Sequence, residues 1–264
     1  MPKSEKELAY LADLYVQAEW TRRFTELVDK HIDLTETENL AYLNAGTGEH
    51  AISLGEKFGK TTDVFASCEN AEVLLIARDK AAALRSAVDF SQIRFEDDSF
   101  DAVFADASFA FGEEAAEVAE EAIRIARVGA DVAFFLPSAG SFGEIFSLLW
   151  EVLETEDLGP NGPNVEELIT QFPSTAELKR LAESLGLVNV RRETVNEIFE
   201  YENGEEFVTS PFVADFLLPR WLAPLDEDEQ KRVVDALAKL IDDEDGSMAF
   251  RFSVKATLVT GEKG

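Results

Sequence analysis

A glycine-rich turn between an apolar segment and a helical pattern constrains this chain more than any other feature of its sequence. In residues 38–59, ENLAYLNAGTGEHAISLGEKFG, an apolar run ends in the turn NAGTG and a helical pattern follows directly. Gly46 and Gly48 allow close approach of the backbone to a ligand, and the N–H groups of the next helix point to the same place. The stretch predicts a first β-strand that enters a nucleotide-binding α/β domain. A tight strand–helix connection without a ligand has the same pattern, so that interpretation stays open.

The rest of the chain supports an α/β fold. Strand and helix patterns alternate from residue 38 to residue 155, which predicts a parallel sheet with helices on both faces. Further strands are expected after the loop at 159–164, and the last one alternates near the C-terminus. The expected strands of the first half are 62–67, 99–109 and 130–139.

Three regions of different pattern suggest how the chain is organised. Residues 1–37 are expected to form an N-terminal helical cap, and residues 38–200 together with 245–264 the α/β domain. Residues 201–244 contain an apolar stretch interrupted by proline, followed by an acidic amphipathic helix. We expect them to form a helical insertion or lid within the same domain.

Composition excludes several classes of function. The net charge is -29, from 53 acidic and 24 basic residues, and a surface this negative repels phosphate backbones and anionic lipid. Nucleic acid is therefore not an expected partner. The single cysteine, Cys68, and the two histidines, His31 and His50, are too few for a disulfide framework or a Cys/His metal site. No apolar run is long enough for a membrane span and the N-terminus lacks the pattern of a signal peptide, so we expect a cytoplasmic location.

Two cofactor classes fit the glycine turn. Residues 46–51, GTGEHA, match a dinucleotide fingerprint, with Glu69 near the distance expected for a ribose-binding acid. The turn NAGTG also resembles the first motif of class I S-adenosylmethionine (SAM)-dependent methyltransferases. Later segments resemble the same family in order and spacing and favour this second interpretation. They are IARDKAA, IRFEDDSFDAVFADASF, ARVGADVAFF and STAELKRLAESLGLVNV.

The resemblance implies a Rossmann-like sheet of seven strands with helices on both faces and an antiparallel last strand. The segment after the second helix is several residues shorter than in the family, so strand 3 is expected to be shortened or missing. The resemblance also implies SAM as cofactor. The cofactor-binding positions that it assigns are Asn44, Ala45, Gly46, Thr47, Gly48, Cys68, Glu69 and Asp89.

Several of these positions depart from the family's pattern. Tyr42 stands at an acidic position, Asn44 replaces the first glycine, and Cys68 aligns with the acid that binds the ribose hydroxyls. A thiol lacks the two charged acceptors of a carboxylate, although Glu69 is adjacent. Asp89 matches the adenine-contacting acid if VDFSQIRF is that motif.

Two further residues near the turn are candidates for a role. Asp106, at the end of an expected strand, either orients a substrate or acts as a general base, or else it caps the next turn. His50, on the first turn of the helix after the glycines, is expected to be an exposed helix residue rather than a base.

Three functions remain open at this point. The first is a SAM-dependent methyltransferase that acts on a small or lipid-like acceptor. The second is a methyltransferase-fold scaffold or regulatory subunit that has lost SAM binding and has a protein partner, with a homodimer among the possibilities. The third is dinucleotide binding through residues 46–51 and Glu69.

Overall fold

The computed structural model describes residues 3–90, 94–159, 162–245 and 249–264. The chain forms two compact units, and three strands run from one into the other. The large unit consists of Met1–Leu136, Pro173–Val195 and Ala256–Gly264, and the small unit of Pro137–Phe172 and Asn196–Lys255. The expected motif VDFSQIRF and the loop at 159–164 both extend into residues outside the described part.

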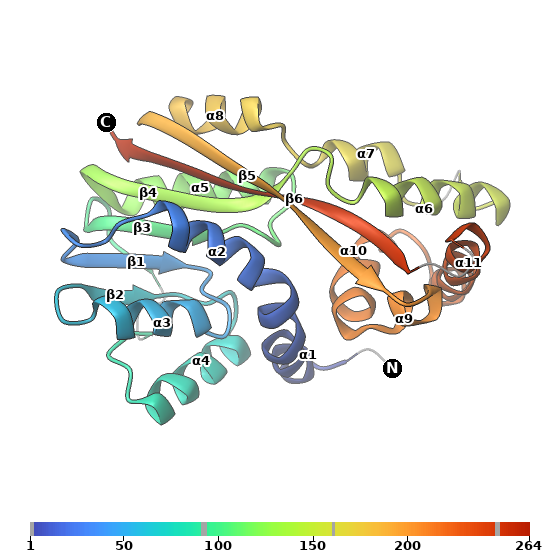
Figure 1. Cartoon of the computed structure of the whole chain (residues 1–264), viewed down its shortest axis with the longest axis horizontal. Coiled ribbons are helices and arrows are strands. Elements are labelled where there is room, and N and C mark those ends of the chain that lie inside the picture. Colours follow the sequence, from blue (N-terminus) through green and yellow to red (C-terminus); the bar gives the residue numbers. More distant parts are fainter. Residues whose placement is uncertain (1–2, 91–93, 160–161, 246–248) are drawn as a thin grey trace. The chain divides into compact units, whose positions relative to one another are not determined.

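The large unit begins with three consecutive helical segments, α1 (Glu5–Leu11), the π-helix η1 (Ala12–Thr21) and α2 (Arg22–His31). Ser4 and Glu7 form a capping box at the start of α1. Strands and helices then alternate as the sequence pattern predicts (Figure 1). These elements are β1 (Asn39–Leu43), α3 (Glu49–Phe58), β2 (Asp63–Ala66), α4 (Ala71–Leu84), β3 (Phe100–Asp106), α5 (Glu113–Ile125), β4 (Ala126–Ser138), α8 (Thr175–Ser184), β5 (Leu187–Tyr201) and β6 (Phe250–Lys263).

The sheet contains six strands in the described part of the chain, in the order β2-β1-β3-β4-β6-β5. Strands β1 to β4 pair in parallel, as expected for strands joined through helices. In Figure 1 the arrowheads of β5 and β6 point in opposite directions, so the sheet is mixed.

The expected count of seven strands is wrong: among the described residues the sheet has six, and the strand predicted to be shortened is represented there by one bridge. Asp89 pairs with Phe65 of β2, and its backbone N–H and C=O bond to Val64 and Ala66 at 2.8 and 2.9 Å. Only Val88 and Phe90 alternate inward around it, and the residues from Glu96 to Asp98 are charged.

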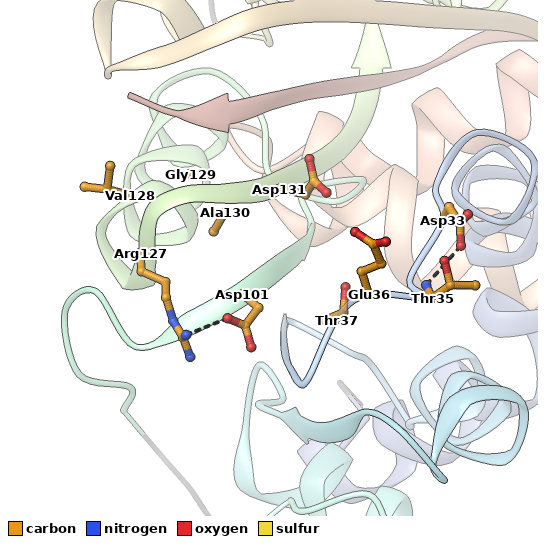
Figure 2. Close-up of a pocket in the computed structure, with 10 residues that line it drawn as sticks. All are labelled: Asp33, Thr35, Glu36, Thr37, Asp101, Arg127, Val128, Gly129, Ala130 and Asp131. Carbon is orange, nitrogen blue, oxygen red and sulfur yellow. Dashed lines mark hydrogen bonds and ion pairs between the residues drawn. The ribbon is translucent and has the colours of Figure 1, made fainter.

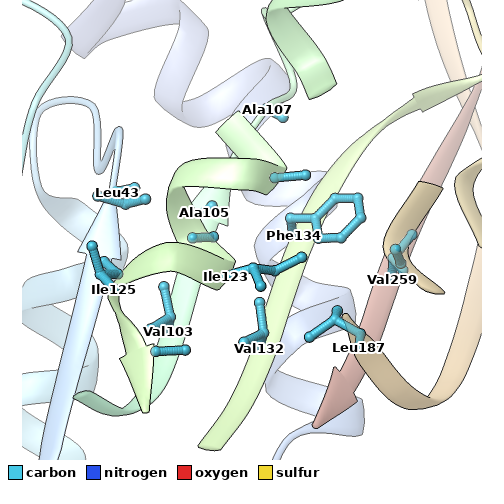
Figure 3. Close-up of a cluster of buried hydrophobic side chains, with 14 of the residues drawn as sticks. Leu43, Val103, Ala105, Ala107, Ile123, Ile125, Val132, Phe134, Leu187 and Val259 are labelled. Atoms are coloured by element: carbon cyan, nitrogen blue, oxygen red, sulfur yellow. The ribbon is translucent and has the colours of Figure 1, made fainter. Parts of the chain in front are cut away.

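The core of the large unit lies between the sheet and helices α5 and α8. Ala115, Ala119 and Ala122 face the sheet from α5, and their small side chains let the helix pack close to the strands. Branched and aromatic side chains of the strands fill the remaining space (Figure 3). They include Leu43, Val103, Val132, Phe134, Leu187 and Val259.

The small unit is built around aromatic side chains. Its helical elements are α6 (Gly143–Thr155), α7 (Val165–Thr170), α9 (Gly204–Thr209), η2 (Val213–Leu217), α10 (Leu218–Trp221) and α11 (Glu227–Asp245). Phe142 and Trp221 are almost completely buried and meet edge to face at 5.3 Å between ring centroids. Trp150 is instead exposed on α6. Phe142 and Trp221 are therefore core residues of this unit. None of the helices in the described ranges is long and apolar enough to cross a membrane.

Phe134 is the side chain on which we expect the stability of the large unit to depend most. It is fully buried in the centre of β4, and Phe134→Ala should lower the free energy of unfolding by about 3–5 kcal/mol. Leu84→Ala, at a side chain that is 59% exposed on α4, should stay within about 0.5 kcal/mol. The urea midpoints of the two variants check this, and equal midpoints would contradict the assignment of the core.

Candidate functional site

The glycine turn is held at the carboxyl ends of three parallel strands. Asn44 follows β1, and its side-chain Nδ2 donates to the carbonyl oxygen of Asp106 at the end of β3, at 3.1 Å. The N–H of Ala45 donates to the carbonyl of Ser67, just after β2, at 2.8 Å. Ligands of open α/β sheets bind at this edge. The structure therefore brings the sequence-predicted turn and Asp106 together.

Three residues of the turn have left-handed backbone angles, namely Asn44 with φ 54°, Gly46 with φ 56° and Gly48 with φ 85°. Asparagine and glycine are the residue types that adopt this conformation most readily, so Asn44 satisfies the backbone where the family has its first glycine. The change at this position leaves the path of the turn intact.

The space next to both glycines is filled by side chains of the chain itself. A Cβ at Gly46 would lie 2.3 Å from the Nε2 of Gln17, and one at Gly48 would lie 2.8 Å from the ring of Phe90. Gln17 is buried and comes from the π-helix η1. Glycines let another group pack closely against the backbone. Here the groups that do so come from the N-terminal cap and from the segment after α4.

A polar cluster fixes η1 onto the turn. The carboxylate of Asp13 accepts a hydrogen bond from the hydroxyl of Thr47 at 2.5 Å and forms an ion pair with Lys80 of α4. The ammonium of Lys80 also lies 3.3 Å from the Thr47 hydroxyl. We call these three residues the Asp13 clasp. The sequence analysis missed Asp13, Gln17 and Lys80, because they lie some 30 residues or more from the turn and no short motif marks them.

Glu69, and not Cys68, is the acid available after β2. Burial raises the pKa of the Cys68 thiol to about 12, so it is neutral and unreactive at neutral pH. Burial also raises the pKa of Glu69, although backbone N–H groups of Glu69 and Gly46 donate to its carboxylate and lower it. The Glu69 side chain is nevertheless accessible to solvent.

Asp106 carries a carboxyl group suited to proton transfer. Burial raises its pKa to about 7, against the effect of hydrogen bonds from Ser108, and the negative charge of Glu69 raises it further. The Ser108 N–H donates to the Asp106 Oδ1 at 2.7 Å. A group with a pKa close to neutral can both accept and release a proton at neutral pH.

Asp89 and Tyr42 complete the surroundings of the turn. Asp89 is half-buried beside β2 and precedes Phe90, whose ring covers Gly48. Tyr42, at the position where the family has an acid, is buried, and burial raises the pKa of its hydroxyl well above the usual range. It therefore contributes a neutral phenol under the turn.

The expectation that His50 is exposed is wrong. His50 is buried, and its Nδ1 lies 3.0 Å from the hydroxyl of Tyr42, while its Nε2 lies 3.5 Å from the Asp29 carboxylate. The first turn of α3 faces the sheet at this point, so the imidazole finds a phenol on β1. A hydrogen bond with His50 lowers the pKa of Asp29. The three residues link β1, α3 and α2 below the turn.

Comparisons with known proteins identify the fold. Residues 43–134, from the end of β1 into β4, match the family model described as a methyltransferase domain. The fold is that of the class I SAM-dependent methyltransferases. The six strands of the sheet agree with that family's architecture apart from the reduced strand. No curated protein matches the chain.

Among solved structures, the chain is similar to the YcgJ protein from Bacillus subtilis, with 14% identity, a TM-score of 0.60 and coverage of 92% of this chain and 98% of that one. It is similar to a chain from the complex of the Haloferax volcanii Trm112 methyltransferase activator, with 16% identity, a TM-score of 0.56 and coverage of 100% and 99%. It is also similar to phosphoethanolamine N-methyltransferase 2 of Haemonchus contortus, solved with S-adenosyl-L-methionine, with 14% identity and a TM-score of 0.52. That match covers 92% of this chain and 52% of the other. At these identities the likeness concerns the fold.

The raised pKa of Asp106 predicts a pH dependence of stability. The folded protein holds a proton on Asp106 that the unfolded chain, with a carboxyl pKa of about 3.9, releases, so the stabilisation from this proton is complete below about pH 4. It is lost as the pH rises through about 7. Asparagine cannot ionise, so Asp106→Asn should gain stability relative to the parent protein over this interval and level off above it.

Unfolding midpoints at a series of pH values measure this difference. The control is Asp79→Asn, at an exposed carboxyl on α4. A difference between parent and Asp106→Asn that does not change with pH would show that Asp106 is an ordinary solvated carboxylate.

Proposed function

We propose that this protein is a SAM-dependent methyltransferase that acts on a small or lipid-like acceptor. The observation that carries the proposal is the position of Glu69, accessible after β2 and hydrogen-bonded to the N–H of Gly46 in the glycine turn. A carboxylate there offers the ribose hydroxyls of SAM two charged acceptors. Glu69 thereby supplies what Cys68, the residue aligned with the family's acid, lacks.

The remaining cofactor contacts that we propose come from the turn and from Asp89. Backbone groups of Asn44 to Thr47 lie at the carboxyl ends of the strands, where the amino-acid part of the cofactor would bind. Asp89, beside β2, is the candidate for the adenine end. Support for SAM in particular comes from the fold and from the Haemonchus contortus enzyme, which was solved with it.

In this mechanism the cofactor supplies an electrophilic methyl carbon, and the protein positions the acceptor in line with it. Asp106 takes the proton that the acceptor atom loses when it forms its new bond to carbon. When bound, SAM would supply the methyl group, and its sulfur would keep the electron pair of the broken carbon–sulfur bond. Because Glu69 and Asp106 make this edge of the sheet negative, the proposal favours a neutral or cationic acceptor over an anionic one.

The second candidate is a methyltransferase-fold scaffold without cofactor. The observation that favours it is the occupation of the turn by Gln17 and the Asp13 clasp, which leave the glycines packed against the chain's own side chains. The similarity to a chain from the Trm112 activator complex adds a precedent for a protein partner. The cytoplasmic location and the role of residues 201–244 as a lid stay predictions.

Binding of S-adenosylhomocysteine to purified protein tests the first candidate. At about a hundredfold over its dissociation constant the ligand should add about 2.7 kcal/mol of stability, seen as a thermal shift. Glu69→Gln removes a charged acceptor and should weaken binding about tenfold or more, whereas Cys68→Ser should leave it unchanged. Equal losses in both variants, or protection by NADH and not by the SAM pair, would contradict the assignment.

The Asp13 clasp can be separated from cofactor binding with a second set of variants. If the clasp competes with the cofactor, Asp13→Ala should free η1 from Thr47 and Lys80 and should strengthen S-adenosylhomocysteine binding, measured by calorimetry. Asp79→Ala, next to Lys80 on α4, is the matched control. Absence of binding in both the parent protein and Asp13→Ala would favour the scaffold.

A further inference from the structure

A hollow lies in the large unit, at the edge of the sheet opposite the glycine turn. Its volume is about 620 Å³, and Figure 2 shows the side chains around it. It is lined by the loop at 33–37 before β1, by Asp101 at the start of β3 and by residues 127–131 of β4. These are the amino ends of the parallel strands. The hollow is therefore independent of the proposed cofactor site.

Three carboxylates in this hollow have no ion-pair partner in the described part of the chain. Asp33, Glu36 and Asp131 form no ion pair with any residue in the described ranges. The cation in the wall, Arg127, is paired with Asp101 at 2.6 Å. Burial raises the pKa of Asp131, and the charge of Glu262 adds to the effect. These three side chains are exposed, so a cation from solution can pair with them.

The hydroxyl of a buried threonine also points into the hollow. Thr37 is only 7% exposed, and its backbone is fully used, since its N–H donates to Leu34 and its carbonyl accepts from Thr62. Its side-chain hydroxyl makes no hydrogen bond with any described residue. In Figure 2 it points toward the side of the hollow where Glu36 and Asp131 lie. A hydroxyl that faces a hollow from a buried residue, and has no hydrogen-bond partner among the described residues, is suited to a ligand's N–H group.

The charges are spread out and do not converge on one point. Among the residues that the structure describes, no group of three or more His, Cys, Asp or Glu side chains could hold a metal ion. A smaller hollow of about 220 Å³ shares Asp33 and Asp131 with the first and adds Glu262. The carboxylates therefore line an extended path, which matches a chain with separated positive charges better than a compact ion. Arg191 and His31 also line the smaller hollow.

We propose that this hollow binds a linear polyamine. The ammonium groups pair with the carboxylates of Asp33, Glu36 and Asp131, and the Thr37 hydroxyl accepts a hydrogen bond from one of them. The exposed side chain of Val128 and the Cβ of Ala130 lie along the methylene segments. Such a ligand would join the segment before β1 to the start of β4.

Calorimetric titration of the full chain with spermidine, at constant ionic strength and with Mg²⁺ in parallel, tests the proposal. The double variant Glu36→Gln/Asp131→Asn should weaken spermidine binding about tenfold or more, since it removes two charge-assisted contacts. Thr37→Val should weaken binding by a smaller factor. The control Asp79→Asn/Glu120→Gln removes the same charge at exposed positions of the same unit and should leave binding unchanged.

The outcomes separate a built site from general attraction to an acidic protein. The proposal would be overturned if the double variant and its control weakened spermidine binding equally. It would also be overturned if Mg²⁺, at the same concentration of positive charge, displaced spermidine. Absence of measurable binding to the parent protein would overturn it as well. Retained circular dichroism and unfolding midpoints in the variants exclude a folding defect as the cause of a loss.

Discussion

The hydrogen bonds that tie the glycine turn to two neighbouring strands are the constraint on which the candidate site depends. Asn44 bonds to the end of β3 and Ala45 to the end of β2, so the turn leaves β1 in a fixed direction. Because β1, β2 and β3 are parallel, all three end at the same edge. Glu69 and Asp106 reach the turn as a consequence of this arrangement. The site therefore follows from sheet geometry together with one left-handed turn.

The same turn has two potential occupants. Its glycines permit the close approach of a cofactor, yet in this structure Gln17 and Phe90 fill the space beside them. The Asp13 clasp adds an ion pair and a hydrogen bond to the contact between η1 and the turn. A ligand that enters must replace these contacts, so its affinity is reduced by their free energy. The two proposed functions, enzyme and scaffold, differ in the expected outcome of this competition.

The acidic composition has different effects at the two edges of the sheet. At the carboxyl edge, burial raises the pKa of Asp106 to about 7, so this carboxyl group is partly protonated near neutral pH. At the amino edge, Asp33, Glu36 and Asp131 line an open hollow and lack cationic partners among the described residues. A net charge of -29 by itself indicates only a solvated, repulsive surface. The position of each carboxylate relative to buried polar groups gives it a more specific role.

The sequence by itself determined the order of strands and helices and the glycine turn, because these depend on local periodicity and on residues close together in the chain. Its resemblance to the class I methyltransferases implied the rest of the fold. It also indicated that strand 3 is shortened, from the length of the segment after α4. Tertiary structure decided that a single bridge at Asp89 remains, that His50 is buried against Tyr42, and that Glu69 has solvent access while Cys68 carries an inert thiol. It also brought Asp13, Gln17 and Lys80 to the turn. Contacts of this kind join residues far apart in sequence, and burial and electrostatic environment exist only once the chain has packed, so no local pattern encodes them.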